Sequence, residues 1–145
     1  VKDIAERDFL REPIRGEFVV ADARAYVRDT ALRYDVVVVD VYSALTSIPA
    51  HLVTREFWRT TRRALAVDGV MVANLLLDPQ LATPYARNLL ATIEAEYGAC
   101  AVEVLFRDRP LANVLVTCSA AAEPRAAEPY TDERNRADMD VLRSR

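Results

Sequence analysis

The sequence predicts an α/β domain in which a mostly parallel β-sheet is flanked by helices. Short runs rich in β-branched residues alternate along the chain with segments whose apolar residues recur at helical spacing. One run, residues 34–40, holds four consecutive valines without polar alternation, which is typical of a strand buried on both faces of its sheet. Alternating strands and helices pack as a parallel sheet with right-handed crossovers.

The amino-terminal part is expected to contain two helices and one strand. Residues 1–12 alternate charged and apolar side chains at a spacing that predicts a short amphipathic helix. Residues 17–22 are interpreted as a strand that ends in an acid. Residues 23–32 follow as a helix. Asp22 is its expected N-cap, because an Asp oxygen at that position accepts a free N–H of the first turn.

The middle of the chain is organised around the strand 34–40, which ends in Asp40. Ligands of open α/β sheets bind at the carboxyl ends of strands, so Asp40 either faces a ligand there or only caps a turn or the next helix. Residues 41–48 form a loop, and residues 49–66 a helix that begins with a proline and either runs unbroken or starts afresh near Thr54. Residues 70–76 are predicted to be a third buried strand, with Asn74 late in it and toward the ligand side.

The last part is predicted to hold one more helix and a terminal antiparallel hairpin. Apolar residues recur every four positions over residues 85–97, which indicates an amphipathic helix. Residues 102–106 and 113–118 are expected to be strands, and their short connection implies antiparallel pairing. We assign residues 1–119 to one partial Rossmann-like domain and residues 120–145 to a linker and a polar tail with at most one helix.

Composition excludes several classes of partner. The chain has 145 residues, of which 52% are hydrophobic and 28% are charged, as expected for a globular domain. A net charge of -3 without a basic stripe argues against nucleic acid. No apolar run approaches the roughly 20 residues that cross a bilayer, and the start is not a signal peptide. We therefore expect a cytoplasmic protein without nucleic-acid or membrane partners.

The cysteines and the histidine do not predict a metal site. Cys100 and Cys118 lack a metal-binding spacing and are interpreted as small core residues with reduced thiols. His51 is the single histidine, and without Cys or acid partners in sequence it is interpreted as a structural residue at a helix start. Tyr42 either packs over a ligand or is a surface aromatic of its loop.

Four stretches together resemble the later part of the spermidine synthase (polyamine aminopropyltransferase) family. They are Val20–Val27, Tyr34–Asp40, Ile48–Leu52 and Asp68–Val70. The resemblance extends over about residues 17–118 and is closest to spermidine synthase-like proteins of bacteria. It implies the Rossmann-like fold of class I S-adenosylmethionine-dependent methyltransferases, here without the first two family strands.

The resemblance also implies roles for individual residues. Asp22 would accept a hydrogen bond from the adenine amino group of the donor, with the Ala23 backbone nearby, and Pro49 and Ala50 would line the adenine pocket. Asp40 would deprotonate or orient the attacking amine, with Tyr42 and Ser43 near the substrate. The implied donor is decarboxylated S-adenosylmethionine or S-adenosylmethionine itself, the acceptor is an amine, and no metal takes part.

Two departures from the family pattern bear on function. The family has a second acid three residues after the catalytic one, and here that position is Ser43. A multiply charged polyamine would lose an ionic partner there, which puts putrescine and spermidine in doubt as substrates. The Gly-rich turn that approaches the donor is also absent, because the chain has only Gly16, Gly69 and Gly98.

The missing family strands would lie between the predicted strands 17–22 and 35–40. Three explanations stay open: the chain is a fragment of a longer protein, a partner fills the gap, or the two strands pair directly. The chain begins with Val1 rather than Met, in keeping with the first. An open sheet edge would be a surface for association, so we expect a homo-oligomer, most simply a dimer.

Three functions follow as hypotheses. The first is a spermidine synthase-like transferase domain that uses an S-adenosyl sulfonium donor, in an intact or a truncated and inactive form. The second is an S-adenosylmethionine-dependent methyltransferase of the same fold. The third is a non-catalytic domain that acts through association.

Overall fold

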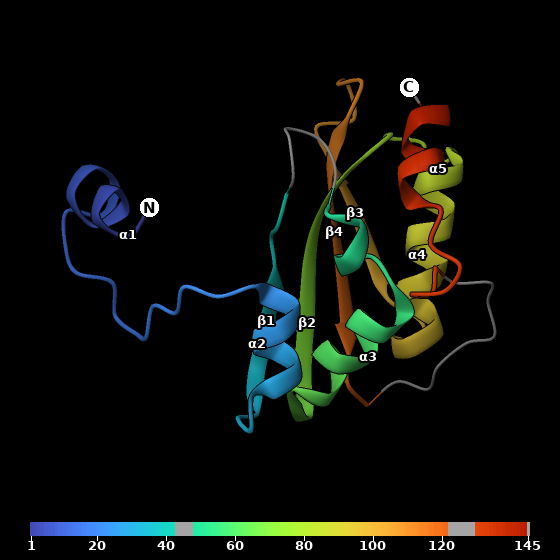
Figure 1. Ribbon diagram of the computed structural model, residues 1–145. Helices are drawn as coiled ribbons and strands as arrows, with labels where there is room; N and C mark the ends of the chain where they lie inside the picture. The colour runs from blue at the N-terminus through green and yellow to red at the C-terminus, as the bar shows by residue number, and fades with distance from the viewer. Residues whose placement is uncertain (43–47, 122–129, 145) are drawn as a thin grey trace.

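The computed structural model describes residues 1–42, 48–121 and 130–144 (Figure 1). Ser43, which is predicted to lie near the substrate, is outside the described residues. In chain order the elements are the helix α1 (Lys2–Ile4), the π-helical turn η1 (Ala5–Leu10), α2 (Ala23–Asp29), β1 (Tyr34–Val39), the 3₁₀ turn η2 (Ala50–Leu52), α3 (Arg55–Arg63), β2 (Leu65–Leu77), α4 (Pro84–Tyr97), β3 (Ala101–Leu105), β4 (Ala112–Ser119) and α5 (Ala137–Arg143).

The four described strands form one mixed sheet in the order β1-β2-β4-β3. β1 pairs with β2 in parallel, whereas β4 is antiparallel to both of its neighbours. The α/β class and the terminal antiparallel hairpin are thereby confirmed. The prediction of a mostly parallel sheet is wrong for the described residues, because only one of the three strand pairs is parallel and the predicted strand 17–22 joins no ladder.

Residues 17–22 form no strand, are exposed, and do not pair with β1. The explanation in which these two strands pair directly is therefore wrong in this structure. A strand needs a neighbour to bond its backbone and cover its side chains, and here Val20 stays 89% exposed. In Figure 1 the chain before α2 runs away from the body and ends in the separate α1–η1 helix.

β1 is a strand as predicted, but it is not buried on both faces. Val39 is 5% exposed, whereas Val36 and Val38 are 57% and 65% exposed. The strand lies at the edge of the described sheet, and its valines alternate between the core face and an open face. A run of valines therefore specified the strand, while its burial depended on neighbours that the described chain does not supply.

The core lies between one face of the sheet and the helices α3 and α4. Alternate residues of β2 and β4 are buried on that face, and the residues between them are mostly half-exposed on the other. Trp58 of α3 and Tyr97 of α4 are fully buried, and their aromatic rings supply much of the apolar area. The sheet residues of the core are Met71, Ala73, Leu75, Leu77, Val114 and Val116.

Side-chain caps define where the helices begin. An oxygen of Asp22 accepts from the backbone N–H of Ala25 at 2.9 Å, so Asp22 is the N-cap of α2 as predicted. Thr54 caps α3 in the same way, which breaks the predicted helix 49–66 into η2 and α3. Gly98 ends α4 with a positive φ of 75°, a conformation that glycine adopts without strain.

Cys100 and Cys118 form a disulfide bond, so the expectation of two reduced thiols is wrong in this structure. The reason is the register of the hairpin. Ala101 of β3 pairs with Thr117 of β4, and the next antiparallel pair along the ladder brings residue 100 opposite residue 118. Sequence spacing alone does not reveal that register.

The carboxyl-terminal residues 130–144 pack against the body through α5. Tyr130 and Ala137 are buried, and the buried carboxylate of Asp140 accepts hydrogen bonds from Tyr130 Oη and Asn88 Nδ2, both at 2.7 Å. The segment holds one helix, as expected. The division of the chain at residue 119 stays a prediction. None of the helices in the described residues has the length and apolarity needed to cross a membrane.

Candidate functional site

Asp40 directly follows β1 and lies beside Asn74, which is late in β2. Val39 of β1 pairs with Ala73 of β2, so the residue that follows each lies beside the other. Asn74 Nδ2 donates a hydrogen bond to Asp40 Oδ1 at 3.1 Å. The sequence placed both residues toward the ligand side, and the structure brings them into contact.

Asn113 extends this pair across a third strand. β4 is antiparallel to β2, so its first residues lie at the same edge of the sheet as the last residues of β2. Asn113 Nδ2 donates to Asn74 Oδ1 at 2.9 Å. We call the three side chains Asp40, Asn74 and Asn113 the polar row. Asn113 was not predicted from the sequence, because its place follows from the pairing of β2 with β4, for which the sequence has no local signal.

Tyr42 lies over the same end of the sheet, beside Asn74. Its hydroxyl donates to the backbone oxygen of Asn74 at 2.8 Å, and its side chain is partly covered. Burial, followed by the negative charge of Asp40, raises the pKa of Tyr42. The phenol therefore keeps its proton at neutral pH and acts as a hydrogen-bond donor. Its predicted role toward a substrate stays a prediction.

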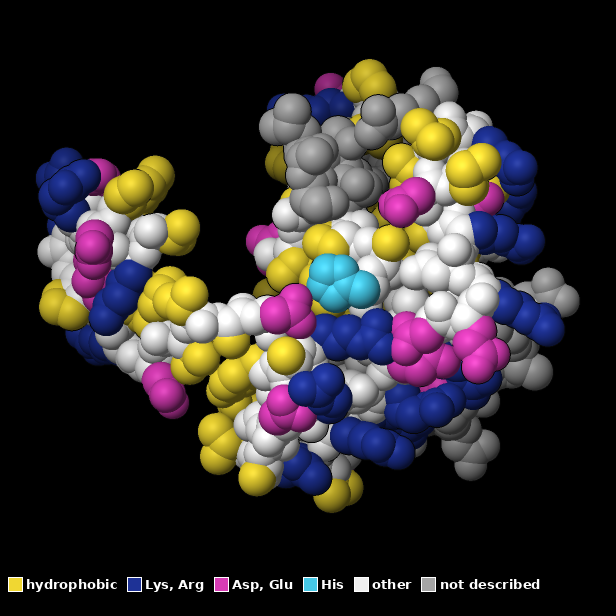
Figure 2. Space-filling view, in the orientation of Figure 1, with side chains coloured by type: hydrophobic (Ala, Val, Ile, Leu, Met, Phe, Trp, Pro, Cys, Tyr) yellow, Lys and Arg dark blue, Asp and Glu magenta, His cyan; other side chains and the backbone are white. Residues whose placement is uncertain are grey.

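A second group of residues surrounds the start of α2. Asp22 Oδ2 lies 3.2 Å from His51 Nε2 of η2, while Oδ1 is occupied by the N-cap hydrogen bond. The hydrogen bond from the Ala25 N–H, with a smaller contribution from His51, holds the pKa of Asp22 below its usual value. Figure 2 shows the histidine on the surface with an acidic side chain beside it. His51 thus has an acid partner that sequence spacing did not indicate.

The carboxyl-terminal segment fastens α2 and η2 to each other. Arg24 forms a bidentate pair with Asp132, and its Nη1 also donates to the backbone oxygen of His51 at 2.9 Å. Asn135 Nδ2 donates to the backbone oxygen of Ala50 at 2.6 Å. These contacts hold Asp22, Ala23 and the η2 turn in one place. These contacts were not predicted from the sequence, in which residues 130–145 were interpreted as a tail.

The two groups of residues lie on the same side of the molecule. α2 runs in the direction opposite to β1, so its first turn points toward the end of the sheet where β1 finishes (Figure 1). The first turn of α2 directs its free N–H groups to that side. Pro49 directly precedes η2 there, so the predicted adenine-pocket residues are neighbours in the structure.

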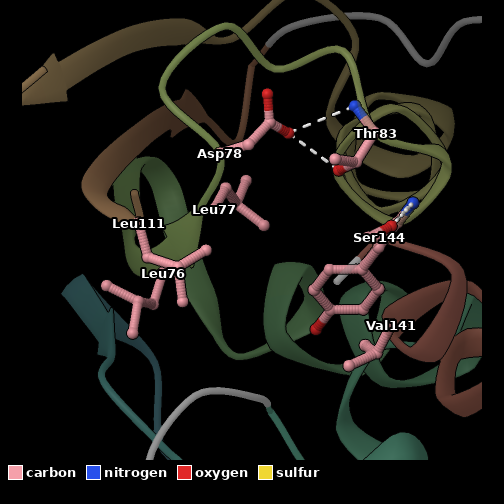
Figure 3. Close-up of a pocket in the computed structure, with 8 residues that line it drawn as sticks. Leu76, Leu77, Asp78, Thr83, Leu111, Val141 and Ser144 are labelled. Carbon is pink, nitrogen blue, oxygen red and sulfur yellow. Dashed lines mark hydrogen bonds between the residues drawn. The ribbon is translucent and has the colours of Figure 1, made fainter. Parts of the chain in front are cut away.

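A small pocket of about 50 Å³ lies beyond the carboxyl end of β2. The carboxylate of Asp78 accepts from the backbone N–H of Ala82 and from both the N–H and the hydroxyl of Thr83, the last at 2.7 Å (Figure 3). Both oxygens of Asp78 are thereby bonded within the turn that leads into α4. The residues lining the pocket are Leu76, Leu77, Asp78, Thr83, Tyr85, Leu111, Val141 and Ser144.

Within the described residues, no three His, Cys, Asp or Glu side chains come together in a way that could hold a metal ion. The chemistry available at the polar row is that of one carboxylate with neutral donors around it. A carboxylate can accept a proton or hold a cation, and amides and a phenol can donate hydrogen bonds.

Comparison with known proteins identifies relatives of one kind. A polyamine aminopropyltransferase of Vibrio vulnificus (strain CMCP6) is 40% identical over 78 residues, which are 51% of this chain and 26% of that protein. No family model matches the chain.

Solved structures show the same fold. A probable spermidine synthase from Corynebacterium glutamicum ATCC 13032 aligns with a TM-score of 0.64 at 20% identity, over 98% of this chain and 50% of its own. A spermidine synthase in complex with the transition-state analogue AdoDATO aligns with a TM-score of 0.62 at 20% identity, over 97% of this chain and 50% of its own. The spermidine synthase of Thermotoga maritima gives 0.58 at 22% identity, over 97% and 52%. The chain therefore spans about half the length of these relatives.

Proposed function

We propose that this chain, which is related to the spermidine synthase (polyamine aminopropyltransferase) family, takes part in the transfer of an aminopropyl group from an S-adenosyl sulfonium donor to an amine. The observation that carries the proposal is Asp40 at the carboxyl end of β1, held by a hydrogen bond from Asn74. The acid occupies the position that the resemblance assigns to the catalytic carboxylate.

The proposed chemistry needs an acid at this position. An alkylamine is protonated at neutral pH, and only its neutral form has a lone pair for attack. Asp40 accepts a proton from the ammonium group and passes it to solvent. The amine nitrogen then bonds to the aminopropyl carbon that is attached to the sulfonium sulfur. The bond between that carbon and the sulfur breaks, and its electron pair stays on sulfur. The products are an alkylated amine and methylthioadenosine.

The donor pocket is assigned to Asp22, Ala23, Pro49 and Ala50. An ionised carboxylate offers about four acceptor positions, so Asp22 retains capacity for the adenine amino group beyond its bonds to Ala25 and His51. These residues fit the adenine end of a donor. The sequence has no Gly-rich turn for the rest of the donor, so we expect a weak site unless additional chain supplies one.

A thermal-shift titration tests the proposal. The ligands are decarboxylated S-adenosylmethionine, S-adenosylmethionine and methylthioadenosine at millimolar concentration. Decarboxylated S-adenosylmethionine and methylthioadenosine are expected to raise the unfolding midpoint, because a ligand of the native state stabilises it. The shift should vanish in Asp22→Ala. Thr83→Ala is the matched control, since it also removes an N-cap, at α4, but leaves the donor pocket intact.

The outcomes of this titration separate the hypotheses. A larger shift with the decarboxylated donor supports aminopropyl transfer, whereas a larger shift with S-adenosylmethionine favours methyl transfer. Equal loss of the shift in Asp22→Ala and Thr83→Ala would contradict the assignment of the pocket. No shift with any of the three nucleosides would contradict donor binding by this chain alone and favour the non-catalytic hypothesis.

Self-association through β1 remains our prediction for the oligomeric state. β1 is an edge strand of the described sheet with Val36 and Val38 exposed on its open face, and an unpaired strand of this kind can pair with a second copy. We expect light scattering after size exclusion to give the mass of a dimer, and Val38→Lys to give a monomer. Val102→Lys, on the outer strand at the opposite edge, should leave the dimer intact. A wild-type monomer would contradict the prediction.

A further inference from the structure

We propose that Asn113 is a positioning residue for Asp40 and acts through the side-chain amide of Asn74. The inference rests on the proposed function, because it assigns a task to Asp40. Its structural content is independent of catalysis: Asp40 can only accept, which gives the polar row its direction, and Asn113 bonds the remaining oxygen of Asn74 and so holds that amide in place.

The direction follows from the two ends of an amide. An Asn side chain has an oxygen that accepts hydrogen bonds and a nitrogen that donates them. Asn113 Nδ2 donates to Asn74 Oδ1 at 2.9 Å, so the oxygen of Asn74 faces Asn113. The Nδ2 of Asn74 must then face Asp40, where it donates at 3.1 Å. The reverse orientation would place the Asn74 oxygen against a carboxylate oxygen, and two acceptors repel each other.

The backbone holds the row in register. Asn74 and Asn113 lie on neighbouring antiparallel strands, where Leu76 pairs with Asn113 and Asn74 pairs with Leu115, so the two amides are diagonal neighbours on one face. Tyr42 fixes the same point of β2 by donating to the Asn74 backbone oxygen at 2.8 Å. The row therefore runs across β1, β2 and β4 without a break.

The choice of residue also needs an explanation. Asn is depleted in strands, and the open face around Asn74 and Asn113 otherwise carries Val72, Leu76 and Leu115. Both amides are only partly exposed, so each gains from a defined partner. The presence of asparagine at both positions is explained if the two amides together present an N–H group to Asp40.

The consequence for Asp40 is a defined orientation. One oxygen, Oδ1, is held by Asn74, which leaves Oδ2 directed away from that bond and able to meet an amine. A carboxylate that rotated freely would spend less time in the geometry that receives the proton. Asn113 contributes to this geometry without touching the substrate.

The test is Asn113→Asp. A carboxylate at this position can only accept, so it competes with Asp40 for the Nδ2 of Asn74, and one of the two carboxylates must then face the Asn74 oxygen. Thr117→Asp is the matched control, because it adds the same charge on the same face of β4, opposite Val72 and away from Asp40. Thermal unfolding of both variants, measured first, confirms that each is folded.

The first readout is independent of activity. In ¹⁵N–¹H spectra, the side-chain NH₂ resonances of Asn74 are expected to shift in both Asn113→Asp and Asp40→Asn, and to stay in place in Thr117→Asp. Unchanged Asn74 resonances in a folded Asn113→Asp variant would overturn the inference. Because this readout needs no substrate, it decides the inference even if the wild-type chain transfers no aminopropyl group, a result that would contradict the proposed function alone.

The second readout uses transfer to an amine, followed by the release of methylthioadenosine. Asn113→Asp is expected to lower kcat about tenfold or more, the effect of losing a hydrogen bond to a charged group, with the KM for the donor nearly unchanged. Adding Asn113→Asp to Asp40→Asn should cause no further loss, because the residue acts through Asp40. Additive losses in the double variant would overturn the inference.

Discussion

Replacing Asp40 by Asn is expected to lower the rate of aminopropyl transfer about 10²- to 10⁴-fold, the range typical of a general base. The amide keeps the shape of the side chain but cannot accept a proton from an ammonium group. The donor pocket around Asp22 belongs to different elements, α2 and η2, so the thermal shift by the donor should be unchanged. Methylthioadenosine release at saturating donor and amine is the measurement.

The control for this prediction is Asp29→Asn, at the exposed end of α2. It removes one negative charge from the chain without touching the polar row, and its rate should equal that of the wild type. A transfer rate in Asp40→Asn within a few-fold of the wild type would remove the acid from the mechanism. In that case shape and donor positioning alone, as in methyl transfer, would account for catalysis.

Replacing Glu96 by Gln is expected to give a large loss of stability for a single polar substitution. Glu96 of α4 is 6% exposed. Its carboxylate forms ion pairs with Arg55 and Arg59 of α3, the latter at 3.0 Å. Arg62 donates to the Glu96 backbone oxygen, which joins the same two helices.

The expected loss of unfolding free energy follows from the partial burial of the ion pairs. Removing one partner of a buried ion pair costs about 3–5 kcal/mol, but the arginines here are partly exposed and keep some hydration. We therefore expect the free energy of unfolding to fall by about 2 kcal/mol at neutral pH, measured by urea denaturation. Glu94→Gln, on the same helix and more exposed, is the control and should change little.

The effect of Glu96 should depend on pH in one direction. Burial raises the pKa of Glu96, but the hydrogen bonds and charges of Arg59 and Arg55 outweigh it, so the pKa lies below the ordinary 4.5. The carboxylate therefore contributes stability that is fully present above pH 4.5 and lost as the pH falls through the lower, native-state value. The difference between wild type and Glu96→Gln should shrink with acidification. A difference that is constant from pH 7 to pH 3 would contradict the role of the charge.

Some features of the site were predictable from sequence because their causes are local. Asp22 is an N-cap because its side chain bonds a backbone N–H three residues away. The valine run makes β1 a strand because branching at Cβ restricts the side chains. Asp40 and Asn74 were expected at one edge because parallel strands present their carboxyl ends together, and they form a hydrogen bond there.

Other features depended on contacts between distant residues. The segment 17–22 has the composition of a strand, yet it is exposed and unpaired, because a strand is stable only beside another one. The disulfide between Cys100 and Cys118 depends on the register of β3 against β4. The same kind of long-range pairing, of β4 with β2, brings Asn113 to the polar row.

The sequence by itself determined the α/β class, the N-cap of α2, the strand that ends at Asp40 and the similarity to the aminopropyltransferases. These depend on residue type, short spacings and motifs, which act within one or two turns of chain. Only the tertiary structure decided which strands pair and which face of the sheet stays open. It also decided the contacts of Asp132 with Arg24 and of Asn135 with the backbone of Ala50. Such features depend on contacts between residues far apart in sequence, whose geometry exists only after the chain has folded.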